Sequence, residues 1–219
     1  MSDVENEQIK TEVAIATEQG KDLHAMVRDI TMRAMAHREL SASEVMGVVR
    51  AVTEGVTLGL GRRTGEIKDA VRGALSGLDE ALKKAAESTK LAAQQLLSQS
   101  KDFSQQDLKP ALDELKQMEE MFLSTVSKVS AAAGGRIKEE FASQLSHVRR
   151  SGTDSGRVVA STVAEFSHSA GSTLKTGAHQ TAKAALEMKQ RLTLLASGIL
   201  AGMADALHEK AKPGERKAP

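Results

Sequence analysis

The sequence contains no cysteine, tryptophan or tyrosine, and it has only four phenylalanines and three prolines. Without cysteine the chain cannot form a disulfide, a thiolate nucleophile or a cysteine-ligated metal site, which favours an intracellular, cytoplasmic protein. Because large aromatic residues are nearly absent, a core must be built from alanine, valine, leucine and methionine. The scarcity of proline and the abundance of strong helix formers predict an all-α protein rather than a sheet or a disordered chain.

The charge is almost balanced, with 30 Lys and Arg against 29 Asp and Glu and a formal net charge of +1. This balance gives no overall field that would attract nucleic acid, and the aromatic residues on which bases stack are scarce, so a nucleic-acid partner is not expected. The charges are distributed unevenly, because residues 136–191 hold nine basic against five acidic side chains. That excess indicates a weak preference for anionic surfaces in the C-terminal half.

The sequence shows no targeting or membrane-spanning segment. Residues 1–5 are acidic and lack an apolar stretch, which argues against a secretory signal. The longest uncharged run, residues 192–204, would extend roughly 20 Å as a helix, whereas the hydrocarbon core of a bilayer is about 30 Å thick. Any association with a membrane is therefore expected to be peripheral.

Apolar residues recur every eleven positions through most of the chain. Eleven residues complete three turns at about 3.67 residues per turn, so such a column stays on one side of a nearly straight helix. The sequence therefore predicts long rods, each with one apolar stripe. The columns are Val45, Val56, Ile67 and Leu78; Val49, Leu60, Val71, Leu82 and Ala93; and Leu115, Val126, Ile137, Val148, Val159, Ala170, Thr181, Leu192 and Met203.

These rods are expected to form one elongated domain over residues 11–210, between a flexible N-terminus at 1–10 and a disordered tail at 211–219. Short links between consecutive helices favour antiparallel neighbours, which predicts an elongated antiparallel bundle of about four long amphipathic helices. The predicted helices cover residues 11–38, 42–100, 108–150 and 156–210.

Local signals set the boundaries between these helices. Ser41 and Glu44 have the spacing of a capping box, so a helix is expected to begin after Ser41. Pro110 fits the first turn of a third helix, which a bend at 134–135 would divide, and turn-forming residues at 151–156 precede the fourth. Two alternatives stay open for residues 42–100, an unbroken helix or a kink or loop near 59–61, because each mid-helix glycine costs roughly 1 kcal/mol relative to alanine.

Several glycines are spaced four residues apart. On a helix this spacing places both glycines on one face, where the missing side chains let a second backbone come close. We expect such glycines to mark close helix packing. They are Gly55, Gly59, Gly61, Gly65, Gly73, Gly77, Gly198 and Gly202.

The sequence offers no pattern of residues that would support catalysis. Residues 59–65 are rich in glycine and arginine, but they lack the preceding strand and the Gly-Lys-Ser/Thr ending of a phosphate-binding loop. His168 and His179 would stand roughly 16 Å apart along a helix and cannot share one metal ion. No serine lies in a nucleophile elbow. We therefore expect no catalytic residue, no metal site and no cofactor, and a protein that is not an enzyme.

The last two segments combine bulky apolar residues with unusually few charges. In residues 153–182 the side opposite the apolar residues is mainly Ser, Thr, Gly and His. A weakly charged polar face suits insertion into an apolar–polar boundary, whereas the commoner arrangement in soluble bundles is that neighbouring helices cover both sides. The candidate surface-binding residues are Val158, Val159, Val163, Phe166, Leu174, Leu192, Leu195, Ile199, Leu200 and Met203.

In its long Ala-, Glu-, Lys- and Gln-rich amphipathic helices and its eleven-residue columns, the chain resembles the exchangeable apolipoproteins. More loosely, it resembles the phasins that coat storage-polymer granules in bacteria. The resemblance covers residues 42–207, although regular proline-punctuated repeats are missing. It implies a non-enzymatic protein that associates reversibly with a lipid or hydrophobic granule surface, without spanning a membrane. The alternative is a scaffolding bundle or coiled coil that forms homo-oligomers or binds partner helices.

Overall fold

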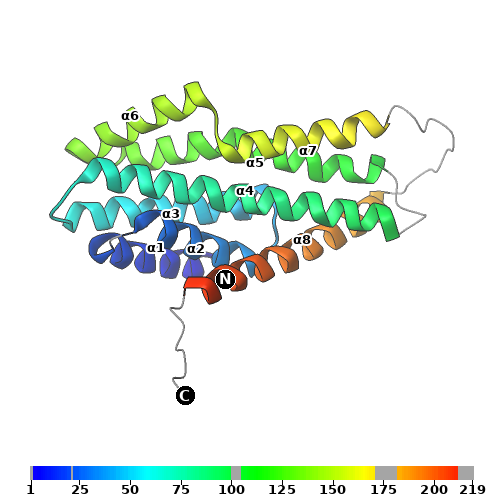
Figure 1. The fold of residues 1–219 in the computed structure, drawn as a ribbon, viewed down its shortest axis with the longest axis horizontal. Coiled ribbons are helices and arrows are strands. Elements are labelled where there is room, and N and C mark those ends of the chain that lie inside the picture. Colours follow the sequence, from blue (N-terminus) through cyan, green and yellow to red (C-terminus); the bar gives the residue numbers. More distant parts are fainter. Residues whose placement is uncertain (1, 21, 100–104, 171–181, 212–219) are drawn as a thin grey trace, which may run out of the picture.

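The computed structural model describes residues 2–20, 22–99, 105–170 and 182–211, and within these ranges it is all-α, without a strand. Most of the helices run along the long axis of an elongated bundle (Figure 1). The helices are α1 Ser2–Gln19, α2 Leu23–Ala36, α3 Ala42–Arg62, α4 Ile67–Gln99, α5 Gln105–Ala131, α6 Gly135–Ser151, α7 Asp154–Ala170 and α8 Ala182–Ala211.

The N-terminal part differs from the sequence-based prediction in two ways. Residues 2–10, expected to be flexible, belong to α1, and Ile9 is buried. The rod expected at 11–38 is two helices, because α1 ends at Gln19 and α2 begins after Asp22, whose carboxylate accepts a hydrogen bond from the Ala25 N–H. At the other end, Ala211 closes α8 and residues 212–219 lie outside the described residues.

The segment 42–100 is not an unbroken helix, and the structure agrees with the alternative of a loop near 59–61. The segment is divided between α3 and α4 at residues 63–66, a few positions beyond the glycines that suggested a kink or loop. The Arg63 guanidinium lies in this turn and donates hydrogen bonds of 3.0 Å to the carbonyl oxygens of Thr17 and Gly20 at the end of α1. The turn therefore satisfies carbonyl groups that a helix C-terminus leaves without partners. The helix at 42 begins as expected, since the Ser41 hydroxyl accepts from the Glu44 N–H.

The two remaining rods are also interrupted. The predicted third helix is divided between α5 and α6 next to the expected bend, and Gly135 has a φ of +52°. Gly152 follows α6 with a φ of +77°, a conformation that side chains disfavour, in the turn predicted at 151–156. The predicted fourth helix contains α7 and α8, and residues 171–181 between them lie outside the described residues.

Two helical layers build the N-terminal half. Helix α3 packs on α1 around Gly55 and Gly59, and the two helices run in the same direction. Helix α4 packs on α2 around Gly73 and Gly77, again with both helices parallel. The α1–α2 pair therefore lies on the α3–α4 pair, while α5, α6, α7 and α8 cover the rest of α3 and α4 (Figure 1).

The eleven-residue columns point into the core. Every member of the column from Val49 to Ala93 is buried, although the chain reverses direction between Leu60 and Val71. In the third column Leu115, Val126, Val159 and Leu192 are buried, and Ile137 and Met203 pack partly exposed against the core. The periodicity thus predicted which stripe of each helix is buried, but it did not predict where the chain reverses between helices. The result is an elongated all-α bundle of shorter helices than expected.

Candidate surface-binding site

The candidate surface-binding residues on α7 face inward. Val159 and Phe166 are buried, and Val158 and Val163 are half-buried against the core. This apolar side packs on α4 and α5. Leu174 lies outside the described residues. The α7 residues are consequently covered within a single chain, and binding through them requires α7 to move.

The candidates on α8 are divided between its inner and outer sides. Leu192 and Leu200 are buried, whereas Leu195, Ile199 and Met203 are half-buried. Helix α8 packs mainly on α4 and α2, so its inner side completes the core. Its other side faces solvent.

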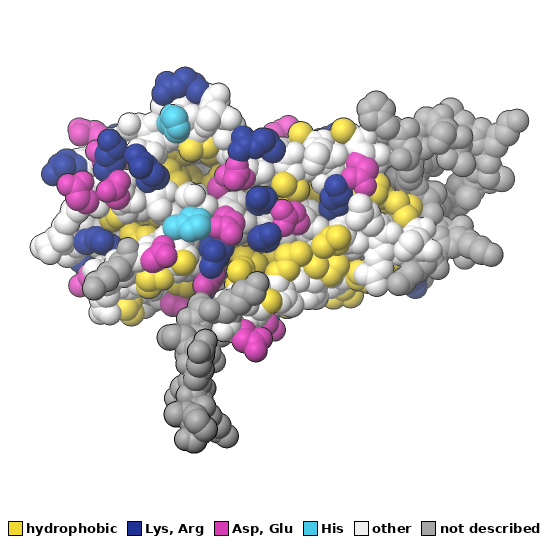
Figure 2. Space-filling view, in the orientation of Figure 1, with side chains coloured by type: hydrophobic (Ala, Val, Ile, Leu, Met, Phe, Trp, Pro, Cys, Tyr) yellow, Lys and Arg dark blue, Asp and Glu magenta, His cyan; other side chains and the backbone are white. Residues whose placement is uncertain are grey.

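The outward face of α8 is apolar and uncharged. Leu194 is 74% exposed, and a Cβ added at Gly198 or Gly202 would meet no atom within 4 Å. These three residues are spaced four apart and therefore share one face of the helix. Because residues 192–204 contain no charged side chain, the face stays uncharged over roughly 20 Å. Figure 2 shows hydrophobic side chains as a yellow band where Figure 1 draws α8.

Polar contacts from Ser197 and Lys189 help to hold α8 against the rest of the molecule. The Ser197 hydroxyl donates to the carbonyl oxygen of Arg38 at 2.9 Å, and Lys189 forms an ion pair of 2.6 Å with Glu114 of α5. The Arg38 guanidinium in turn donates to Asn6 at 2.8 Å and lies 3.3 Å from the Glu5 carboxylate. The link between α2 and α3 thus connects α8 to α1.

A network of carboxylates and hydroxyls holds the N-terminus of α7. Asp79 of α4 accepts hydrogen bonds from the backbone N–H groups of Asp154 and Ser155, at 2.8 and 3.0 Å. The Ser155 hydroxyl lies 2.7 Å from Asp79 and 2.8 Å from Glu119 of α5, and Thr153 donates to Glu119. Thr153 and Ser155 are buried. Since a helix N-terminus has unsatisfied N–H groups and favours negative charge, the two carboxylates fix α7 to α4 and α5.

A second contact fixes α7 further along α4. Lys90 lies 2.6 Å from the Glu165 carboxylate, and Gln94 donates to the same carboxylate at 2.9 Å. The hydrogen bond from Lys90, with that from Gln94, holds the pKa of Glu165 below its ordinary value. The contact is an ion pair between helices, and the lowered pKa means that it persists to more acidic pH than an ordinary glutamate would allow.

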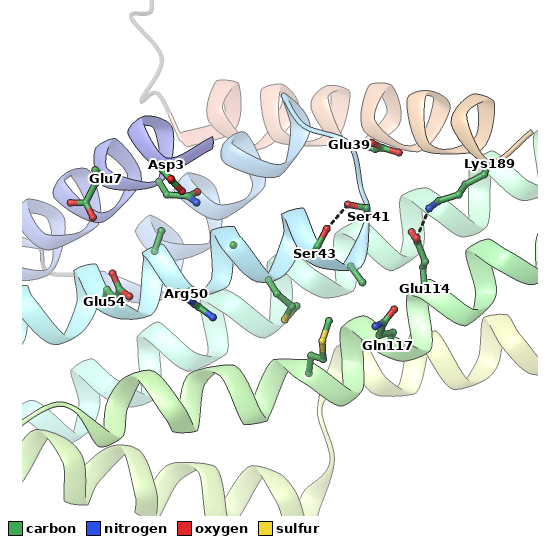
Figure 3. A pocket seen from close by; sticks show the side chains of 16 residues that line it. Asp3, Glu7, Glu39, Ser41, Ser43, Arg50, Glu54, Glu114, Gln117 and Lys189 are labelled. Atoms are coloured by element: carbon green, nitrogen blue, oxygen red, sulfur yellow. Dashed lines mark hydrogen bonds and ion pairs between the residues drawn. The ribbon is translucent and has the colours of Figure 1, made fainter. Parts of the chain in front are cut away.

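The groove in Figure 3 has a volume of about 940 Å³ and lies among α1, α3, α5 and α8. Five carboxylates and two cations line it, and Lys189 and Glu114 pair across one end. Among the residues that the structure describes, no group of three His, Cys, Asp or Glu side chains is placed to hold a metal ion. The groove offers mixed charge on bundle helices and supports no specific reaction. The carboxylates are those of Asp3, Glu7, Glu39, Glu54 and Glu114, and the cations are Arg50 and Lys189.

The glycines proposed for close packing form two groups. A Cβ added at Gly55, Gly59 or Gly77 would lie 2.4 to 2.6 Å from a backbone oxygen of α1 or α2. Gly73 is less tight, with its nearest atom at 3.4 Å. The remaining four glycines have no neighbouring helix close by. A Cβ added at Gly65 would meet only the Arg63 side chain, at 3.7 Å, and one added at Gly61, Gly198 or Gly202 would meet no atom within 4 Å.

Sequence reasoning left Leu194 out of the candidate set, although it is the most exposed large apolar residue among those described. The uncharged run at 192–204 pointed to this segment, but only packing shows which side of α8 faces outward. The accessible apolar surface of the predicted region therefore lies on the outer face of α8, next in sequence to the half-buried candidates Leu195, Ile199 and Met203, and not on α7.

The fold and the outer face of α8 define an all-α bundle with an uncharged, solvent-facing apolar band. The chain belongs to a family of unknown function, DUF6781, whose model matches residues 1–209. No curated protein and no solved structure matched the chain. No helix in the described parts of the chain is both long enough and apolar enough to cross a bilayer.

Proposed function

We propose that this protein associates reversibly with a lipid or hydrophobic granule surface and that the outer face of α8 makes the first contact. The observation that supports the proposal is the uncharged band around Leu194, Gly198 and Gly202. Two of these positions are glycines without neighbouring atoms, so the band is flat and can lie against a broad apolar surface. A water-facing helix ordinarily carries charged residues there.

A second stage would use the inward candidates. Burying Val159, Phe166, Leu192 and Leu200 contributes roughly 6 to 12 kcal/mol in gross transfer free energy, so the closed bundle is favoured in water. An apolar surface can replace those contacts when α7 and α8 move away from α4. The polar contacts of Ser155, Glu165 and Ser197 are then the ones that must break.

The alternative function is a scaffold in which the same band packs on a second copy or a partner helix. Exposed apolar residues on α1 favour it independently. Val4 and Ile15 are eleven residues apart, 68% and 49% exposed, and belong to the solvent side of α1. An apolar stripe that the bundle leaves open is typical of a protein–protein contact.

The test places charge in the α8 band without disturbing the core. In the double variant Leu194→Glu/Gly198→Glu both new side chains point into open space, and replacing a helical glycine favours the helix. We expect flotation with phosphatidylcholine vesicles, or co-sedimentation with apolar granules, to fall at least about tenfold because charge at an apolar boundary is costly. The matched control is Ile15→Glu, which places a charge at an exposed apolar position on α1.

The two functions give different results in this test. If the protein acts on surfaces, the wild type is a monomer by sedimentation equilibrium, and its binding is lost in the α8 variant alone. If it is a scaffold, the wild type forms a defined oligomer whose mass vesicles do not change. Vesicle and granule binding that survives both glutamates would contradict a role for α8.

A further inference from the structure

A groove between α4 and α6 gathers cations that the bundle does not neutralise. It has a volume of about 520 Å³ and lies on the part of the molecule where α6 runs beside α4 and α5. Lys68 and Arg72 enter it from α4, and His147 and Arg150 enter it from α6. Figure 2 shows basic side chains and a histidine over this region, beside some carboxylates.

These cations have few partners among the described residues. Arg72 reaches only Asp69, at 4.0 Å between two exposed side chains, and Arg150 donates to the neutral Ser146 hydroxyl at 3.1 Å. No ion pair or hydrogen bond within the described residues engages the Lys68 ammonium. Other cations of the bundle, such as Lys90 and Lys189, have carboxylates at 2.6 Å. The groove is thus a place where positive charge is available to a ligand.

The one carboxylate among the groove's lining residues, Asp79, carries a single negative charge against three cations and forms no ion pair with Lys68, Arg72 or Arg150. Asp79 accepts three hydrogen bonds from the N-terminal turn of α7, through the N–H groups of Asp154 and Ser155 and the Ser155 hydroxyl. Its oxygens are therefore already engaged at the end of the groove. Neutral donors complete the lining, namely Ser76, Ser143 and Gln144, above a buried apolar floor of Phe122 and Leu145.

We propose that this groove binds a phosphate-bearing ligand. Two or three cations with hydroxyl and amide donors match the oxygens of a phosphate group, and arginine suits them through its fork of N–H donors. The phosphate could belong to a soluble compound or to the headgroup of an anionic lipid. In the closed bundle α6 and α8 lie at opposite edges of the view in Figure 1, so the groove is separate from the α8 band and does not rest on the proposed function.

The test uses pyrophosphate as the soluble probe and phosphatidylglycerol vesicles, compared with phosphatidylcholine vesicles, as the membrane probe. The variant is Lys68→Gln/Arg72→Gln, which removes two exposed cations of the groove. The control is Lys128→Gln/Arg136→Gln, which removes one lysine and one arginine that are also exposed but lie outside the groove. Circular dichroism checks that both variants keep their helices.

We expect calorimetry to show pyrophosphate binding that is weakened about tenfold or more in the groove variant and little in the control, because each lost cation removes a charge-assisted hydrogen bond. If phosphatidylglycerol vesicles alone bind, with the same dependence on the groove residues, the source of the phosphate is a lipid headgroup. Equal weakening in both variants, or no binding of either probe, overturns the proposal. The α8 variant Leu194→Glu/Gly198→Glu should bind pyrophosphate as the wild type does. The proposal for this groove and the proposal for the α8 band are therefore tested independently of each other.

Discussion

At Gly59 the backbones of α3 and α1 come so close that an added Cβ would lie 2.5 Å from the carbonyl oxygen of Ala14. A backbone atom cannot move aside as the end of a flexible side chain can, so even a methyl group forces the two helices apart. At Gly202 on α8 the same methyl group meets nothing within 4 Å. Identical residues on two helices therefore have opposite consequences for stability.

We predict that Gly59→Ala lowers the free energy of unfolding by about 1 to 3 kcal/mol, the usual cost of overpacking. Gly202→Ala should instead leave it unchanged or raise it by up to about 1 kcal/mol, because alanine favours a helix. Urea denaturation followed by circular dichroism measures both. Equal effects of the two substitutions would show that α1 and α3 do not pack closely at Gly59.

The sequence could identify these glycines, but it could not show which of them contact a neighbouring helix and which face solvent. Their four-residue spacing is the same on α3 and α8, and it predicts only that two glycines share a face. Whether that face meets a helix depends on where the chain turns back, as at Arg63, whose guanidinium binds the end of α1. That contact joins residues more than forty positions apart, so no local pattern contains it.

At the scale of helices, α7 depends on a polar attachment rather than on deep packing alone. Its first turn is held by Asp79 and Glu119, and the Ser155 hydroxyl lies between the two carboxylates. Without that hydroxyl the Glu119 oxygen at 2.8 Å loses its donor, while Asp79 keeps the Ser155 N–H, and a partly buried carboxylate oxygen left without a donor costs about 1 to 3 kcal/mol. The attachment therefore sets how readily α7 separates from α4 and α5.

We predict that Ser155→Ala speeds amide hydrogen exchange in α7 by roughly tenfold or more, while exchange in α1 and α3 stays the same. The control is Ser161→Ala on the same helix, because that exposed hydroxyl donates only to the Val158 carbonyl oxygen of its own helix. Unchanged exchange in Ser155→Ala would mean that the network does not restrain α7.

At the scale of helices, the sequence predicted some of the breaks between them and missed others. The eleven-residue columns run through the α3–α4 turn without a change of phase, so the periodicity gives no sign that the chain reverses there. Turn-forming residues at 151–156 were a clear local signal, and α6 does end there, at Ser151. At 63–66 the nearby glycines suggested an interruption, but not the reversal of direction that the Arg63 contacts with α1 accompany.

At the scale of the whole molecule, the closed bundle buries Val159, Phe166, Leu192 and Leu200, while the band on α8 faces solvent. The core around α7 and α8 contains several small residues, such as Ala196 and Ala204, which interlock less deeply than larger side chains. The N-terminal layers are held more tightly, because α1 and α2 contact the glycines of α3 and α4 directly. Opening should therefore begin with α7 and α8 and leave α1 to α4 together.

We predict that surface binding increases the distance between spin labels on α7 and α4 but not between labels on α1 and α3. The chain has no native cysteine, so pairs of cysteines can be introduced for labelling. The test pair is the exposed Ser161 on α7 and Leu91 on α4, and the control pair is Ile15 on α1 and Leu58 on α3. Electron spin resonance with and without phosphatidylcholine vesicles measures both distances, and circular dichroism should show that helicity is retained. If the protein binds while the α7–α4 distance stays fixed, α8 acts alone and the inward residues serve only the core. If both pairs separate together, the glycine contacts do not keep the N-terminal layers closed.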